Sequence, residues 1–110
     1  MKAKINFNGK LIEIPDIIEV KGIKKYTGLM FKGKNTNALL FDFKEPGKKA
    51  IHSLFCNDFL AVWLNEGKIV DYKLINSIKL LIKPENEFTH LLEIPVNEKY
   101  SSIISNFIKN

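Results

Sequence analysis

Arginine is missing from this sequence: every one of its 17 Lys and Arg positions is a lysine, and the net charge is +5. Proteins that read nucleic acids rely on arginine, because its planar guanidinium group grips guanine edges and phosphates with paired hydrogen bonds. The lysines are also scattered, with Lys24–Lys25 and Lys48–Lys49 as the tightest pairs. We therefore interpret them as a solvated surface and disfavour nucleic acid as a partner.

Cysteine and long apolar runs are scarce as well. Cys56 is the single cysteine, so no internal disulfide forms, in agreement with a reducing compartment. No apolar run approaches the ~20 residues that span a bilayer. The start MKAKINFNGK lacks the continuous apolar stretch of a secretory signal. We expect a cytoplasmic protein without a membrane partner.

Signatures of cofactor and metal binding are also missing. The glycines of KGIKKYTGLMFKG, residues 21–33, match neither the phosphate-binding loop nor the dinucleotide fingerprint. His52, Cys56 and His90 are three potential metal ligands, but no two of them have the short spacing typical of a zinc site. The sequence therefore predicts no cofactor and no metal.

Short strands dominate what the sequence does contain. Alternating or continuous apolar segments bounded by turn residues predict strands over 2–7, 10–20, 38–43, 50–56, 59–64, 68–75, 77–83 and 88–96. Asn8–Gly9 predicts a tight hairpin turn, and Pro15 an edge or bend. Residues near 22–27 favour a short helix that ends at Gly28.

The last residues have a different period. Apolar residues recur at helical spacing from Tyr100 to Ile108, after Asn97 as a plausible N-cap, and predict a C-terminal amphipathic helix. Residues 1–110 are therefore expected to form one mainly β domain, either a compact β-barrel or a jelly-roll-like sandwich. Strand order and oligomeric state stay open.

Several segments in order carry a family resemblance: TGLMF (27–31), ALLFDF (38–43), AIHSLF (50–55), WLNEGKIVD (63–71) and LLEIPV (91–96). Over about residues 12–100 the chain resembles the domain of unknown function 192 family, a group of small prokaryotic proteins without an agreed activity. The resemblance implies a β-rich, barrel-like or jelly-roll-like domain. The family's Pro-Leu-Asp step is missing from NDFLAVWL, where Asp58 could supply the acid only from a shifted position.

The pair His52 and Cys56 raises the question of a reactive site. Residues four apart in a strand point to the same face but lie ~13 Å apart, whereas a nucleophile and its base need contact near ~3 Å. His90 could approach either of them from another strand. The simpler interpretation is a packed thiol and a hydrogen-bonded histidine. Asp58 lies at a possible turn or bulge before the predicted strand 59–64. It is the fourth candidate catalytic residue, with His52, Cys56 and His90.

Residues within apolar segments are candidates for a binding site. The ligand-binding candidates are Met30, Phe41, His52, Trp63 and Glu93, each of which also has a plain structural interpretation in the core. We expect a non-enzymatic binding or accessory domain for an unknown small molecule or peptide. The alternative is a small hydrolase-like enzyme that uses His52 or His90 with a nearby carboxylate or Cys56.

Overall fold

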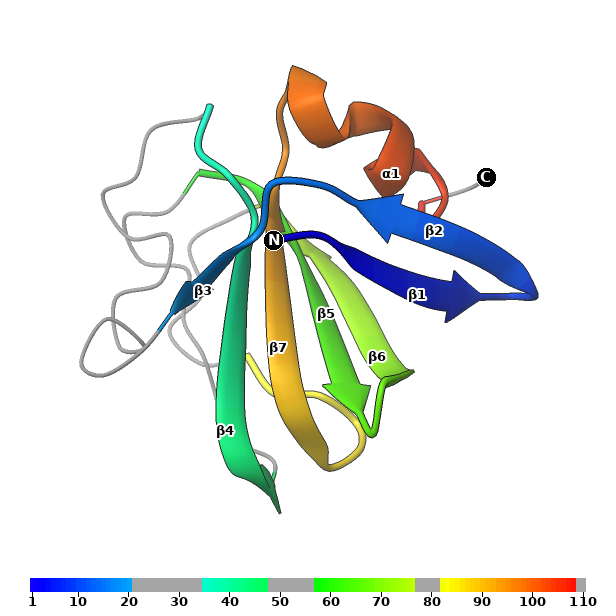
Figure 1. Cartoon of the computed structure of the whole chain (residues 1–110), viewed down its shortest axis with the longest axis vertical. Coiled ribbons are helices and arrows are strands. Elements are labelled where there is room, and N and C mark those ends of the chain that lie inside the picture. The colour runs from blue at the N-terminus through cyan, green and yellow to red at the C-terminus, as the bar shows by residue number, and fades with distance from the viewer. Residues whose placement is uncertain (21–34, 48–56, 77–81, 109–110) are drawn as a thin grey trace.

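The computed structural model describes residues 1–20, 35–47, 57–76 and 82–108. Its elements, in chain order (Figure 1), are β1 (Ala3–Phe7), β2 (Lys10–Ile14), β3 (Ile18–Val20), β4 (Leu39–Gly47), β5 (Phe59–Asn65), β6 (Lys68–Ile75), β7 (Phe88–Pro95), the 3-10 helix η2 (Glu98–Tyr100) and α1 (Ser101–Ser105). None of the helices in this part of the chain is long and apolar enough to cross a membrane.

The described strands form two sheets. β1 and β2 make an antiparallel hairpin, and the larger sheet has the order β3-β4-β7-β5-β6. Within it only β3 and β4 run parallel. The hairpin and α1 lie on one side of the large sheet (Figure 1). The prediction of a mainly β domain is confirmed in its sandwich-like form, and the described strands do not close into a barrel.

Two hairpin turns follow directly from the sequence. Asn8 and Gly9 have φ angles of 53° and 80°, and Phe7 pairs with Lys10 across them. Glu66 and Gly67 have φ angles of 52° and 78° at the β5–β6 turn. Positive φ at both central residues suits the twist of a two-residue hairpin, which explains why Asn-Gly is so strong a signal. The Asn8–Gly9 turn was predicted and is confirmed.

The strand β5 is buried on both faces, as its apolar sequence predicts. Its alternate residues belong to two different cores. Leu60, Val62 and Leu64 join the first core with residues of the hairpin and the C-terminal segment, among them Ile5, Ile12, Ile14, Tyr100, Ile103, Ile104 and Phe107. The second core, on the other face, contains Val20, Leu39, Phe41, Phe59, Ala61, Trp63, Ile75, Ile82, Phe88 and Leu91.

The chain from β2 to β3 and the C-terminal helix differ in detail from the prediction. The predicted strand 10–20 is interrupted at Pro15, because proline has no amide hydrogen for a ladder, and Asp16 adopts a φ of 56°. The C-terminal helix is confirmed, although α1 has only five residues. The predicted helix near 22–27, the strand 50–56 and residues 77–81 lie outside the described residues.

Candidate functional site

The structure describes five of the predicted site residues. Phe41, Asp58, Trp63, His90 and Glu93 are among them. Met30, His52 and Cys56 lie outside the described residues, so the question of a His52–Cys56 pair stays a prediction.

His90 lies on β7, between β4 and β5. Its partners in register are Asp42 on β4 and Leu64 on β5. The imidazole Nε2 is 3.6 Å from Asp42 Oδ2, and the two side chains are 37% and 49% exposed. This separation exceeds a hydrogen bond, and a contact so open to water contributes about 0–1 kcal/mol to stability even between full charges. The β4–β7 pairing therefore places a carboxylate beside His90.

Thr89 completes this cluster on the other side of the ring. Its hydroxyl Oγ1 is 2.8 Å from His90 Nδ1 and also lies 3.4 Å from the carbonyl oxygen of Leu64. A hydroxyl has one hydrogen, so Thr89 either donates to Nδ1 or donates to the carbonyl and accepts from a protonated Nδ1. His90 thus stands between a hydroxyl and a carboxylate, the arrangement through which an imidazole can move a proton.

Sequence reasoning missed Thr89 because neighbouring residues of a regular strand point to opposite faces. The alternation of 88–96 also predicts Phe88 and His90 on one side, and this is wrong. Phe88 belongs to the second core, whereas His90 pairs with Leu64 of the first core. In the same region the β4–β7 register is irregular between the Asp42 and Gly47 pairs, which an alternating pattern does not reveal.

Asp58 is far from this cluster. It precedes β5, and its carbonyl oxygen accepts a hydrogen bond from the Val96 amide at 3.0 Å. Phe59, the next residue, pairs with Pro95, whereas His90 pairs with Leu64 at the other end of β5. Five residues of strand span ~17 Å, so the structure does not bring the candidates Asp58 and His90 together.

The candidates Phe41, Trp63 and Glu93 share the other face of the sheet. Phe41 and Trp63 are members of the second core, and Glu93 pairs with its members Leu39 and Ala61. Trp63 is fully buried and Glu93 is 5% exposed. These residues lie together on the face opposite to His90 and are shielded from water.

Trp63 brings a polar atom, its indole nitrogen, into the second core. The indole Nε1 of Trp63 has no hydrogen-bond partner among the described residues. The Lys73 ammonium lies 5.9 Å from the indole ring centroid and donates to the Lys83 carbonyl oxygen at 2.6 Å. Within the described ranges, no group of three or more His, Cys, Asp and Glu residues could hold a metal ion.

An aromatic cluster connects the hairpin, β6 and the C-terminal segment. The ring centroid of Phe107 is 4.5 Å from that of Phe7 and 5.3 Å from that of Tyr72, and the Phe7–Tyr72 separation is 5.1 Å. Tyr72 and Leu74 are 38% and 37% exposed on the same face of β6, where they pair with Val62 and Leu60. We call Tyr72 and Leu74 the β6 apolar surface.

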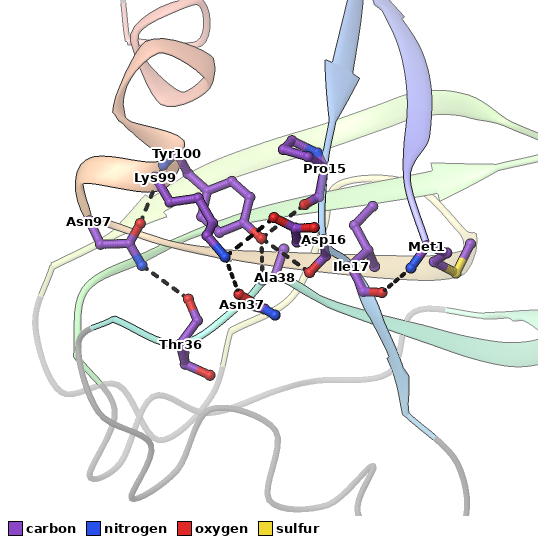
Figure 2. Close-up of polar contacts among 10 residues, drawn as sticks. All are labelled: Met1, Pro15, Asp16, Ile17, Thr36, Asn37, Ala38, Asn97, Lys99 and Tyr100. Carbon is purple, nitrogen blue, oxygen red and sulfur yellow. Dashed lines mark hydrogen bonds and ion pairs between the residues drawn. The ribbon is translucent and has the colours of Figure 1, made fainter.

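A buried tyrosine attaches the C-terminal segment to the rest of the fold (Figure 2). The Tyr100 hydroxyl accepts a hydrogen bond from the Ala38 amide at 3.0 Å and donates to the Pro15 carbonyl oxygen at 2.9 Å, with the Asp16 carbonyl at 3.3 Å. Tyr100 is fully buried. One hydroxyl therefore joins the β2–β3 connection to the residues before β4.

Neighbouring side chains support the same junction (Figure 2). Asn97 accepts from the Tyr100 amide at 3.3 Å and donates to the Thr36 carbonyl oxygen at 3.0 Å. The Lys99 ammonium donates to Asn37 Oδ1 at 2.6 Å and lies 3.3 Å from Asp16 Oδ2. These contacts link backbone segments that are distant in sequence. We therefore assign these side chains a structural role.

The comparisons with known proteins add information about the fold. No protein-family model matches the chain, and no curated protein matches it. A crystal structure from Sinorhizobium meliloti 1021, named "putative transcription regulator", is similar to it with a TM-score of 0.74 and 15% sequence identity. The match covers 93% of this chain and 83% of the other. At this identity the likeness shows the fold, and the resemblance to the domain of unknown function 192 family remains a prediction.

Proposed function

We propose that this chain is a non-enzymatic binding domain that recognises a peptide through the β6 apolar surface. The observation that carries the proposal is the exposure of Tyr72 and Leu74 side by side on one face of the sheet. The rings of Phe7 and Phe107 pack against the Tyr72 ring. Tyrosine with a rigid support is a frequent anchor of protein interfaces, because it offers a large contact area at a small entropic cost.

We propose further that this domain acts in the cytoplasm of a prokaryote. The single cysteine and the resemblance to the domain of unknown function 192 family support a prokaryotic cytoplasm. The similar structure carries the name of a transcription regulator, and an accessory domain that binds a peptide of another protein would suit a regulatory complex. Direct reading of DNA has less support, since the chain has no arginine.

A peptide-display selection against the immobilised chain tests this function. The test variant is Leu74→Ser, and the matched control is Leu11→Ser on the hairpin, where Leu11 is 63% exposed and belongs to neither core. We expect peptides enriched on the wild type to be retained by Leu11→Ser and lost by Leu74→Ser. No enrichment, or equal binding to both variants, would contradict the proposal.

A hydrolase-like function is the second candidate, because Thr89, His90 and Asp42 lie together. The imidazole has a hydroxyl at 2.8 Å and a carboxylate at 3.6 Å. In this role His90 would take the proton of Thr89 or of a water, and Asp42 would stabilise the charged ring. Turnover of model esters and peptides by the wild type and by His90→Ala tests it. An activity that survives His90→Ala belongs to a contaminant or to another site.

A further inference from the structure

The hairpin turn Asn8–Gly9 combines a reactive sequence with an open position. Both residues are exposed, and a Cβ built on Gly9 would meet nothing within 4 Å. An asparagine side-chain amide is most easily attacked by the next backbone nitrogen when that residue is glycine, since no side chain obstructs the approach. Since Asn8 is exposed and the side of Gly9 is open, no packed neighbour of Gly9 obstructs such an attack.

The side chain of Asn6 restrains this reaction. Its Oδ1 accepts a hydrogen bond from the Gly9 amide at 3.1 Å. Attack requires the amide nitrogen to lose its proton and to turn toward Asn8 Cγ, whereas the hydrogen bond keeps the proton in place and directs it toward Asn6. We propose that Asn8 is a site of slow deamidation, that Asn6 holds its rate down, and that modification disables the β6 apolar surface.

The chemistry needs water alone as a co-reactant. The Gly9 backbone nitrogen forms a bond to Asn8 Cγ, the Cγ–Nδ2 bond breaks, and the side-chain nitrogen leaves as ammonia with the proton from the amide. The resulting succinimide then adds water at one of its two carbonyl carbons. Opening at one carbon gives aspartate, and opening at the other gives isoaspartate, in which the main chain passes through the former side chain.

The consequence reaches the aromatic cluster because the turn lies next to it. Phe7 directly precedes Asn8, and its ring contacts Tyr72 and Phe107. Lys10, on the other side, donates to Asn106 Oδ1 at 2.8 Å. Isoaspartate adds one main-chain atom to a two-residue turn, so the Phe7–Lys10 register is lost and the support of Tyr72 changes. This regulatory step rests on the proposed peptide-binding function.

The modification is tested by ageing the full chain at mildly alkaline pH, with isoaspartate at Asn8 measured by peptide mass spectrometry. We expect slow conversion in the native chain, faster conversion in urea, and acceleration in native Asn6→Ala. Asn6→Asp keeps an acceptor for the Gly9 amide and should stay near the wild-type rate. Circular dichroism confirms that each variant is folded.

Equal rates with and without urea would overturn the role of the folded turn, and equal rates in Asn6→Ala and Asn6→Asp would overturn the role of the hydrogen bond. A second arm compares aged with fresh protein for binding of the peptides selected on the wild type. Unchanged binding by fully converted protein would refute the regulatory step. The rate measurements need no ligand, so a failure of the peptide-binding function is distinguishable from a failure of this proposal.

Discussion

Removal of the Tyr100 hydroxyl tests whether its hydrogen bonds attach the C-terminal segment to the rest of the fold. In Tyr100→Phe the ring stays in the first core, but the Ala38 amide loses its acceptor and the Pro15 carbonyl loses its donor. A buried amide left unsatisfied costs about 1–3 kcal/mol, and a lost neutral hydrogen bond about 0.5–1.5 kcal/mol. We expect the free energy of unfolding to fall by about 2–4 kcal/mol, as measured by urea denaturation followed by circular dichroism.

The matched control for this prediction is Tyr72→Phe. Tyr72 is 38% exposed, and no hydrogen bond of its hydroxyl occurs among the described residues, so its loss should change stability by less than about 0.5 kcal/mol. The expected loss for Tyr100→Phe is a large part of the ~5–15 kcal/mol that stabilises a typical domain. Equal, small changes in both variants would show that the buried hydroxyl is not what fastens the segment.

Three other substitutions probe the same fold by urea denaturation. Leu60→Ala removes a fully buried side chain from β5 and should lower the free energy of unfolding by about 2–5 kcal/mol. A decrease under about 1 kcal/mol would contradict the packing of the first core. Asn97→Ala loses both the cap of η2 and the bond to Thr36 and should cost about 1–2 kcal/mol, and no change would exclude a capping role. Lys99→Ala breaks the exposed contacts with Asn37 and Asp16 and should lower the free energy of unfolding by less than about 1 kcal/mol. A larger decrease would show that these contacts are stronger than their exposure indicates.

The sequence predicts the fold where local chemistry decides the conformation. The Asn8–Gly9 turn follows from residues that tolerate positive φ, and β5 follows from an apolar run that suits a strand buried on both faces. The register between β4 and β7 was not predictable, because its irregularity depends on how two strands distant in sequence meet. The order of the strands, with β7 between β4 and β5, depends on the same long-range contacts.

The candidate site was predictable only in part. A histidine within an alternating strand marks His90 as a residue of interest, and the hydrolase-like alternative pairs it with a nearby carboxylate. The identity of that carboxylate, Asp42, depends on a cross-strand pair formed over more than 40 positions of sequence. The alternating pattern does not predict the contact of Thr89 with His90. Tyr72 has the sequence context of an ordinary strand residue, and its exposure depends on how the chain packs.

The two cores restrict where the described sheet can act on other molecules. β5 is buried on both faces, so a partner of this part of the molecule must meet it away from β5; two such places are the His90 end of β7 and the edge strand β6. At the first position the His90 and Asp42 side chains are open to water, where polar groups gain little free energy from one another. At the second, Tyr72 and Leu74 expose apolar surface, the Tyr72 ring packs on Phe7, and covering that surface removes it from water. Burial of apolar surface is the larger available source of binding free energy, which is why β6 rather than His90 is the better candidate for the contact with a partner.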